Sequence, residues 1–326
     1  MRAVIVEGAG TEASLSIQEV EAPPMMPSGV RIRVATAGLN RGDLMQRRGL
    51  YPPPPGASEI MGLECSGEVI EVADGVAGFA VGDRVMALLP GGGYGEEAVA
   101  HSGSVMRVPE GFSDVEAGVF PEVFLTVFSN VFQIAGLPDD GSVLVHGGGS
   151  GIGTATIQLA KEAGARVFVT AGSAGKCARC LELGADLAID YTQQEFADEV
   201  AKATGGQGVD VVLDSIGAGY LDANLRSLSM NGRLVLIGLM QGAKAEANLG
   251  ALLMRRLSII GSTLRGRHVD EKARIVEGLL GRFGAALKAG RLRPVVHASF
   301  PLEQVEQAHA LMQSSEHFGK IALEIR

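Results

Sequence analysis

The sequence contains only three cysteines, Cys65, Cys177 and Cys180, among 326 residues. An odd and small count does not suit a disulfide framework and is typical of a protein in a reducing compartment. No uninterrupted apolar run reaches the roughly 18 residues that a transmembrane helix needs. The N-terminal segment MRAVIVEG is typical of a strand and lacks the apolar core and cleavage site of a signal peptide. These absences predict a cytoplasmic protein without a membrane partner.

Positive charge is also scarce, since 28 Lys and Arg stand against 37 Asp and Glu, for a net charge of −9. Without a basic cluster, nucleic acid is not expected as a main partner. Glycine, in contrast, is abundant at 46 residues, about twice its average share of roughly 7%. This excess fits a turn-rich β part joined to an α/β part, and the length predicts about two domains.

The most informative stretch is Ser142 to Lys176. An apolar β-branched run, Val143 to Val145, leads into five glycines within the seven residues from Gly147 to Gly153 and then into an amphipathic helical pattern. A second β-branched run, Val167 to Thr170, follows, which predicts a right-handed βαβ unit with a glycine turn at the end of its first strand. Such turns hold phosphate, because glycine allows close backbone approach and the next helix offers free N–H groups.

The glycine spacing departs from the usual G-x-G-x-x-G pattern, because Gly148, Ser150 and Gly153 occupy its three positions. A glycine turn that only packs a helix against a sheet is the alternative interpretation. The strand and helix patterns on the correct sides favour nucleotide binding.

The end of the second predicted strand favours NADPH over NADH. NAD-binding folds carry an acidic residue about 20 residues after the glycines, whereas residues 171–176 read AGSAGK. The hydroxyl of Ser173 and the ammonium of Lys176 suit a 2′-phosphate. A solvated Lys176 in the first turn of the next helix is the alternative, although a lysine there is unfavourable to the helix dipole.

The rest of the chain divides into a β-rich part and an α/β part. Short apolar runs between Met1 and about Gly111 predict a compact β barrel or sandwich, and a helix is expected over Val119 to Leu137. Strand-like segments after the βαβ unit bring the total to about six, enough for a doubly wound parallel sheet; they are Leu187–Asp190, Val209–Asp214, Arg233–Leu239 and Leu257–Leu264. Ligands bind beyond the carboxyl ends of such strands, which nominates Gly217 among others.

The tail is expected to return to the first domain. Helical patterns cover Val269 to Lys288 and Leu302 to Gln313, and a terminal strand covers Lys320 to Ile325. The predicted nucleotide domain, 121–264, is then inserted into a β-rich domain made of 1–120 plus 265–326.

This order of elements resembles the medium-chain dehydrogenase/reductase superfamily, and within it the zinc-independent NADPH:quinone oxidoreductases. The segments that carry the resemblance look closest to the tumour-suppressor-induced quinone oxidoreductase branch; they are AGLNRGDLMQRRGLYPPPPGAS, GLECSG, ALLPGGGYGEEAV, VLVHGGGSGIG, VTAGSAGK and GLMQG. The resemblance implies an α/β fold in which a six-stranded Rossmann domain is inserted into a GroES-like, partly open barrel. It also implies a homodimer or a dimer of dimers.

No metal is expected. Zinc-dependent relatives carry a cysteine where this chain has Asn40 and a histidine where it has Leu63, before Glu64, and a catalytic zinc needs about three protein ligands. Cys177 and Cys180 spell C-A-R-C, which is also found in redox and metal sites, but no second ligand pair exists and structural thiols are favoured. His146 is interpreted as a packed or hydrogen-bonded turn residue.

The resemblance assigns roles residue by residue. It implies cofactor contacts from two sets of positions: Ser150, Gly151, Ile152, Gly172, Ser173, Lys176 and Tyr191 at the phosphate and adenosine side, and Thr126, Gly238, Leu239, Met240, Thr263 and Leu264 at the nicotinamide side. The glycine turn adds Gly148 to the expected cofactor site, and the strand ends add Gly217. Phe318 and Lys320 would close the cleft between the domains from the tail. Thr126 has an alternative as part of the polar stripe of a buried helix.

Four polar residues, Asn40, Asp43, Tyr51 and Arg265, are expected near the acceptor, a small-molecule quinone or related electrophile. Tyr51 would position it by stacking or hydrogen bonding, unless it only anchors the proline segment that follows. Three hypotheses follow for the activity: an NADPH:quinone reductase, which the resemblance favours, a reductase of enone or alkenal C=C bonds, and a non-catalytic NADPH-binding protein.

Overall fold

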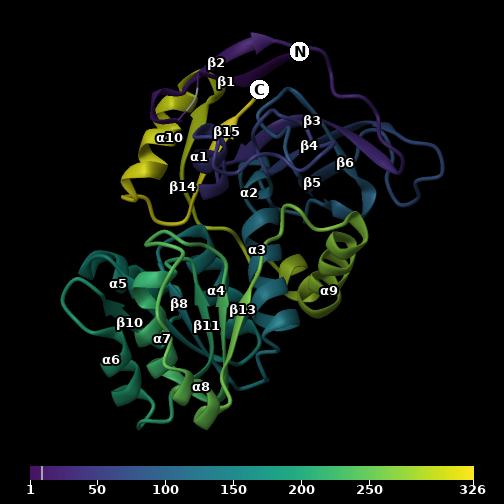
Figure 1. Cartoon of the computed structure of the whole chain (residues 1–326). Coiled ribbons are helices and arrows are strands. Elements are labelled where there is room, and N and C mark those ends of the chain that lie inside the picture. The colour runs from purple at the N-terminus through teal and green to yellow at the C-terminus, as the bar shows by residue number, and fades with distance from the viewer. Residues whose placement is uncertain (9) are drawn as a thin grey trace. The chain divides into compact units, whose positions relative to one another are not determined.

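The structure is a computed structural model that describes residues 1–8 and 10–326. The chain forms two compact units. Unit 1 comprises Met1–Leu125 and Leu264–Arg326, and unit 2 comprises Thr126–Thr263. Figure 1 shows the elements of both units in chain order.

Unit 1 is built on a seven-stranded sheet in the order β14-β15-β3-β4-β5-β7, with β6 also paired to β3, and a separate β1-β2 hairpin. The strands are β1 (Arg2–Glu7), β2 (Ser14–Glu19), β3 (Gly29–Gly38), β4 (Glu64–Val72), β5 (Arg84–Leu88), β6 (Glu97–His101), β7 (Val105–Arg107), β14 (Val296–Pro301) and β15 (Lys320–Glu324). The helices are α1 (Arg41–Arg47), α2 (Asp114–Gly118), α9 (Val269–Lys288) and α10 (Val305–Ser314), and α3 (Pro121–Val127) crosses the boundary. The terminal strand β15 pairs antiparallel with β3, which confirms that the tail returns to the N-terminal part.

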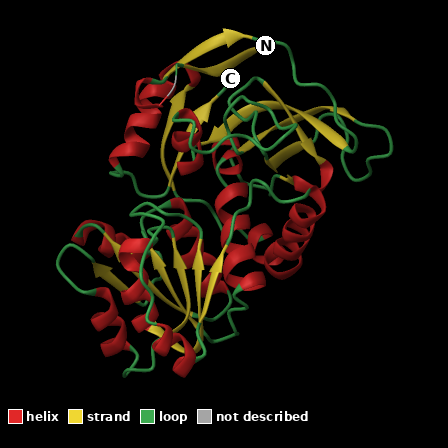
Figure 2. Ribbon diagram, viewed as in Figure 1, coloured by secondary structure: helices red, strands yellow, loops and turns green. Residues whose placement is uncertain are grey.

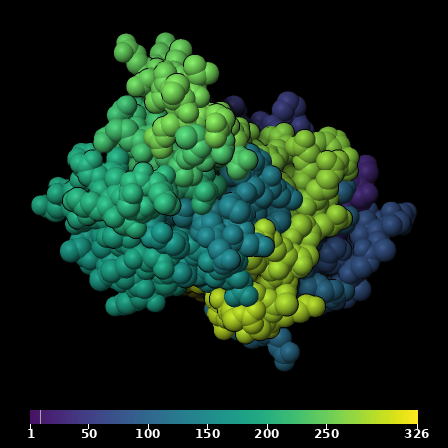
Figure 3. Space-filling view, turned by 90° about the horizontal axis from the view of Figure 1, so that it is seen from below, coloured from purple at the N-terminus to yellow at the C-terminus, as the bar shows by residue number. Residues whose placement is uncertain are grey.

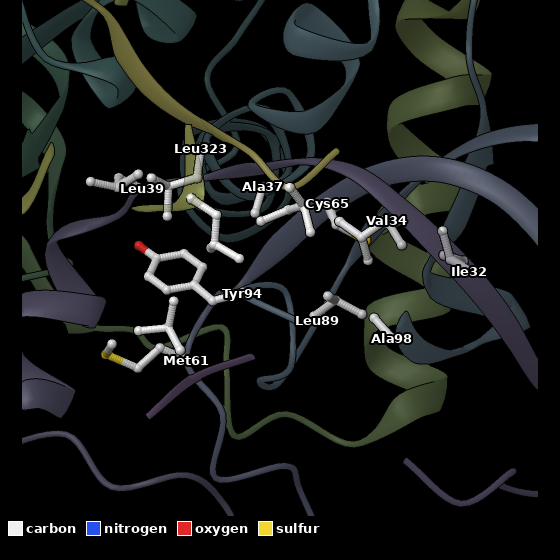
Figure 4. Close-up of a cluster of buried hydrophobic side chains, with 14 of the residues drawn as sticks. Ile32, Val34, Ala37, Leu39, Met61, Cys65, Leu89, Tyr94, Ala98 and Leu323 are labelled. Atoms are coloured by element: carbon white, nitrogen blue, oxygen red, sulfur yellow. The ribbon is translucent and has the colours of Figure 1, made fainter. Parts of the chain in front are cut away.

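The core of unit 1 gathers alternate residues of its strands, as the period of two predicts. Ile32, Val34, Cys65 and Leu323 are fully buried there. Figure 4 shows the Tyr94 ring in this cluster, with its oxygen pointing away from the row formed by Cys65, Val34 and Ile32. The phenol therefore brings a polar atom to the margin of the apolar core.

Unit 2 is a six-stranded sheet in the order β10-β9-β8-β11-β12-β13, and every pair in it is parallel. Its strands are β8 (Ser142–His146), β9 (Arg166–Ala171), β10 (Leu187–Asp190), β11 (Val209–Asp214), β12 (Leu228–Leu236) and β13 (Ser258–Gly261), and its helices are α4 (Gly151–Glu162), α5 (Ala174–Glu182), α6 (Phe196–Ala203), α7 (Leu221–Ser227) and α8 (Leu249–Arg255). Figure 2 shows helices on both sides of this sheet. The predicted doubly wound sheet is confirmed, and its order reverses between β8 and β11, where such folds bind ligands.

The helix expected over Val119 to Leu137 takes a different form. It is α3 followed by a seven-residue π-helix, Phe128–Ile134. The N–H of Ala135 reaches the carbonyl of Asn130, five residues back, at 2.9 Å. The Asn130 amide donates to the carbonyl of Thr126 at 2.8 Å, which supplies a partner in the widened turn. Apolar spacing alone cannot separate the two helix types, because both place residues three to five apart on one face.

Helix α8 carries the most exposed apolar side chains of unit 2. Leu249, Leu253 and Met254 are 71%, 77% and 75% exposed, and Figure 3 shows the light-green atoms of this region projecting from the rest of the unit. Across the described residues, no helix is long and apolar enough to cross a membrane.

Candidate cofactor and acceptor sites

The glycine turn after β8 is shaped by contacts that only glycine permits. A Cβ on Gly153 would lie 2.4 Å from the carbonyl oxygen of Gly147 and 2.5 Å from the Cα of Gly148. Ser150 caps α4, since its Oγ accepts a hydrogen bond from the N–H of Gly153 at 3.0 Å. The serine that breaks the usual glycine spacing is therefore the helix cap. The turn and the N-terminus of a twelve-residue helix form the cradle that a pyrophosphate requires.

Cys180, the second cysteine of the C-A-R-C segment, packs against this turn. A Cβ on Gly148 would lie 2.9 Å from the Sγ of Cys180 and 2.7 Å from the Cβ of Val169. Cys177 and Cys180 are both buried free thiols, and burial raises the pKa of Cys180 to about 12. A thiol with such a pKa is a poor nucleophile and metal ligand, so its contribution is packing under the glycine turn.

The residues predicted to bind the adenosine end converge at the carboxyl ends of β9 and β10. Ser173 caps α5, and its Oγ accepts from the N–H of Lys176 at 3.3 Å. A Cβ on Gly172 would lie 2.7 Å from the hydroxyl of Tyr191, so that ring lies directly over the glycine. Asp190, the residue before Tyr191, accepts from the N–H and hydroxyl of Thr192 at 3.0 and 2.6 Å.

The residues predicted to flank the nicotinamide lie on two turns that pack together after β11 and β12. Gly217 has a φ of +85°, which favours glycine. A Cβ on Gly238 would lie 2.9 Å from the carbonyl oxygen of Ser215. Leu239 and Met240 are 54% and 51% exposed. Thr263 lies shortly after the end of β13 and is the last residue of unit 2. Thr126 is the first residue of unit 2 and is buried.

In unit 1, Asn40 and Lys320 take part in a buried electrostatic cluster with Glu64. The ammonium of Lys320 lies 2.8 Å from Glu64 Oε1 and donates to Asn40 Oδ1 at 2.5 Å and to the carbonyl of Leu39 at 2.6 Å. The Asn40 amide nitrogen donates to Glu64 Oε1 at 2.9 Å. These contacts use the three N–H donors of Lys320. Its role in this structure is to join β15 to the segment between β3 and α1.

Phe318, two residues before this lysine, is also buried. The structure therefore places both tail residues in the interior of unit 1.

Asp43 is buried at the start of α1 and accepts three hydrogen bonds. Its carboxylate receives the N–H of Asn40 at 2.8 Å, the N–H of Gly62 at 3.2 Å and the hydroxyl of Tyr94 at 3.2 Å. The contact with Asn40 is one half of a capping box. Burial nevertheless raises the pKa of Asp43 from 3.8 to about 6, so this carboxyl titrates close to neutrality.

This pKa predicts a pH dependence of folding. Because the folded pKa of Asp43 lies above its ordinary value, its contribution is fully present at low pH and is lost as the pH rises through about 6. Between about pH 4 and pH 7 the free energy of unfolding should fall by roughly 3 kcal/mol from this group. Asp43→Asn stays neutral and should remove that part of the slope in urea unfolding measured over this range. Equal slopes for the variant and the natural chain would contradict the assignment.

Arg265 holds the loop that carries Tyr51. Its guanidinium donates to the carbonyl of Tyr51 at 2.9 Å, to the carbonyl of Pro90 at 2.7 Å and to the side-chain oxygen of Gln46 at 2.7 Å. It also lies 5.0 Å from the centroid of the Tyr51 ring, within the range of a cation–π contact. The structure thus brings Arg265 and Tyr51 together, and the partly buried Tyr51 ring is oriented by the buried arginine. Sequence reasoning missed Gln46, the third member, because no motif marks it.

The residues in the zinc-ligand positions do not fit a metal. The side-chain oxygen of Asn40 is bonded to Lys320 and its nitrogen to Glu64. The side chain of Leu63 has no atom that can bind a metal. In the part of the chain that the structure describes, no group of three or more His, Cys, Asp or Glu residues could hold a metal ion. The glycine turn before α4, in contrast, has the close backbone approach and the helix N-terminus that suit a pyrophosphate.

Two family descriptions match the chain. Residues 26–135 match the alcohol dehydrogenase GroES-like domain, and residues 151–277 match the family described as zinc-binding dehydrogenase. The synaptic vesicle membrane protein VAT-1 homolog of Danio rerio is 32% identical over 338 residues, covering 99% of this chain and 69% of that protein. A phenolphthiocerol/phthiocerol polyketide synthase of Mycobacterium tuberculosis is 30% identical over 98% of this chain. The chain spans only 14% of that synthase.

Solved structures of oxidoreductases also match this chain over nearly its whole length. A quinone oxidoreductase of Pseudomonas syringae pv. Tomato DC3000 matches with a TM-score of 0.87 and 27% identity, covering 99% of each chain. A structure described as an NAD-dependent alcohol dehydrogenase matches with a TM-score of 0.86 and 33% identity, covering 100% of each chain. The CurK enoyl reductase matches with a TM-score of 0.82 and 27% identity, covering 99% of this chain and 98% of that one.

The chain therefore belongs to the medium-chain dehydrogenase/reductase superfamily. Its fold is the superfamily's GroES-like domain combined with a Rossmann-like parallel sheet. Members are oxidoreductases that bind a nicotinamide cofactor and act on small molecules.

Proposed function

We propose that this protein is an NADPH-dependent oxidoreductase that transfers hydride to a quinone without a metal. The observation that carries the proposal is that the polar side chains expected near the acceptor are already hydrogen-bonded within the protein. Asn40 and Asp43 are buried and bonded within the protein, and Arg265 is bonded to Tyr51, Pro90 and Gln46. These groups are poorly placed to stabilise a localised alkoxide. A quinone delocalises the charge that it gains, so it makes little demand on a protein acid.

The residues of this chain would then bind the cofactor, orient the acceptor and shield both from water. When bound, the nicotinamide supplies the hydride. The turn from Gly148 to Ile152 would hold the pyrophosphate, and the turns at Gly217 and at Gly238 to Met240 would hold the nicotinamide half. Thr126, Thr263 and Leu264 belong to the same proposed set. Tyr51, fixed by Arg265, would position the acceptor, and solvent would supply the proton.

A second candidate activity is the reduction of enone or alkenal C=C bonds. An enone also delocalises the charge that hydride transfer creates, so it meets the same condition. Its support is the likeness to the CurK enoyl reductase and to polyketide synthases. A 2-haloacrylate reductase structure is similar too, at 29% identity and a TM-score of 0.84.

The deciding experiment is reduced-nicotinamide oxidation by the purified protein, with a quinone and a matched enone compared under NADPH and under NADH. NADPH-dependent turnover that is faster on the quinone supports the main proposal. Faster turnover on the enone would move the assignment to C=C reduction. Tight NADPH binding with no turnover on either acceptor would contradict both and point to a non-catalytic NADPH-binding protein.

The preference for NADPH depends on Lys176 at the start of α5. Lys176→Met should raise the Kd for NADPH about tenfold, the size of one lost charge-assisted contact, and leave the Kd for NADH almost unchanged. Lys202→Met is the matched control, because Lys202 is exposed on α6 and pairs only with Glu199 at 2.6 Å among the ion pairs of the described residues. Equal losses for NADPH and NADH would contradict a 2′-phosphate contact.

The proposal also covers the branch of the superfamily, the domain bounds, the location and the oligomeric state. The segments that resemble the tumour-suppressor-induced quinone oxidoreductases support membership of that branch, and we propose 1–120 plus 265–326 as the catalytic domain and 121–264 as the NADPH-binding domain. The small, odd number of cysteines supports a cytoplasmic location. The exposed apolar residues of α8 and the edge position of β13 support a homodimer or a dimer of dimers. Unpaired sheet edges with apolar neighbours favour association, and sedimentation would give the oligomeric state.

A further inference from the structure

The interior of unit 2 contains a hydrogen-bonded chain centred on His146, the last residue of β8. His146 is 2% exposed, and its neighbours Thr170, Asn224 and Asp214 are 1%, 0% and 0% exposed. Its Nδ1 lies 3.0 Å from the hydroxyl of Thr170, and its Nε2 lies 2.6 Å from Asn224 Oδ1. Both nitrogens of one buried ring are therefore bonded, to partners on two different elements, β9 and α7.

The hydrogen bonds continue from Asn224 and from Thr170 to the backbone of two turns. On one side, the Asn224 amide nitrogen donates to Asp214 Oδ2 at 3.0 Å. The same carboxylate accepts the N–H groups of Ile216 at 2.6 Å and Gly217 at 3.1 Å. On the other side, Thr170 Oγ1 lies 3.4 Å from the N–H of Gly147, a long contact. The carbonyl of Thr170 accepts from the N–H of Gly148 at 2.8 Å.

The directions of these bonds are fixed from the Asp214 end. A carboxylate only accepts, so Asn224 turns its nitrogen to Asp214 and its oxygen to His146. His146 Nε2 must then be the donor, which leaves Nδ1 to accept from the Thr170 hydroxyl in the neutral ring. Burial lowers the pKa of His146 to about 4, in agreement with a neutral ring.

We infer that His146 is a positioning residue that sets the relative placement of two cofactor turns, the one beginning at Gly147 and the one beginning at Ser215. Both turns end neighbouring strands, β8 and β11, at the point where the strand order reverses. The proposed function assigns the pyrophosphate to the first turn and the nicotinamide half to the second, and this inference rests on that assignment. A displacement of one turn against the other would misplace the two halves of a single ligand.

The residue type supports this role over simple packing. The ring makes edge contacts with Phe196 and Tyr220, with both centroid distances 4.8 Å. A phenylalanine would satisfy those contacts equally well. Only a flat ring with two polar atoms on different edges also joins Thr170 to Asn224. Packing alone does not require the two ring nitrogens of His146. These nitrogens are the atoms that link the two turns.

The first test uses the natural chain without cofactor. Nitrogen-15 histidine NMR should show His146 with its proton on Nε2 and without protonation across roughly pH 5 to 8. A proton on Nδ1, or an imidazolium in this range, would overturn the inference. This readout does not involve NADPH, so it is independent of whether the proposed function holds.

The second test separates positioning from packing. His146→Phe should raise the Kd for NADPH about tenfold, while the Kd for 2′,5′-ADP, which occupies only the proposed adenosine end, changes less than about twofold. Equal losses for NADPH and 2′,5′-ADP would overturn the inference. If neither ligand binds the natural chain, the proposed cofactor site fails while the NMR result stands.

A double variant completes the design. His146→Phe leaves the Asn224 oxygen without its partner, and an added Asn224→Leu removes that buried group. The same change also removes the amide that donates to Asp214, so positioning predicts that the double variant keeps the weakened NADPH binding, because Asp214 has lost its link to β8. Recovery of NADPH binding in the double variant would show that the histidine only satisfies the interior, which would overturn the inference.

Discussion

Lys320→Met is expected to destabilise unit 1 by about 3–5 kcal/mol, the cost of removing one partner of a buried ion pair. The side chains of Lys320 and Glu64 are 4% and 0% exposed. Without the ammonium, the Glu64 carboxylate keeps only the Asn40 amide and the N–H of Glu122, at 2.9 and 2.8 Å, among the hydrogen bonds of the described residues. Two neutral donors do not offset the desolvation of a full charge.

Denaturant unfolding, with amide hydrogen exchange at β15 and β3 to report on unit 1, would measure this loss. Arg84→Met is the matched control, because Arg84 and Asp114 form an ion pair whose side chains are 50% and 47% exposed. Such surface pairs contribute about 0–1 kcal/mol. Adding Glu64→Gln to Lys320→Met should recover much of the lost stability, since it removes the unpaired charge. A single variant no less stable than the Arg84 control would contradict the assigned role of Lys320.

The parallel sheet could be predicted from sequence because its central strands β8, β9 and β11 are almost fully buried and appear as apolar runs rich in β-branched residues. Val143 to Val145 and Val209 to Asp214 became β8 and β11. Strand limits were harder to predict where the sheet is irregular. β12 begins at Leu228, five residues before the expected Arg233, and its pairing with β11 shifts register between Val209 and Val211.

The partners of the polar residues were not predictable. Asn40, Arg265 and Lys320 lie far apart in the sequence, and their side chains end in long-range contacts such as Lys320 with Glu64 and Arg265 with Pro90. Spacing rules describe neighbours within one element only. The sequence indicated a packed or hydrogen-bonded His146, and in the structure its ring is both packed and hydrogen-bonded. The chain through Asn224 could not be predicted, because it joins residues of different elements.

Ser150 illustrates the opposite case. In the sequence, the serine weakened the glycine pattern, whereas in the structure its hydroxyl caps α4. A cap signal was available, because serine directly before a helical pattern is a preferred N-cap residue.

Gly153→Ala should weaken NADPH binding by about a hundredfold or more. The added Cβ would lie 2.4 Å from the Gly147 carbonyl oxygen and 2.5 Å from the Gly148 carbonyl carbon and Cα. These are backbone atoms, so no side-chain rotation relieves the overlap, and the turn must move away from α4. A shift of about 1 Å in a binding group can cost about a hundredfold. Calorimetric titration of NADPH into the variant would measure the loss.

Gly281→Ala is the matched control, since the same methyl group on the remote helix α9 would meet no atom within 4 Å. It should leave NADPH affinity unchanged and stabilise the helix by up to about 1 kcal/mol. Gly153→Ala moves the pyrophosphate turn itself, whereas His146→Phe changes only how that turn is held against its neighbour. The first should therefore weaken NADPH far more than the second, and the reverse order would show that the close approach at Gly153 is not what shapes the site.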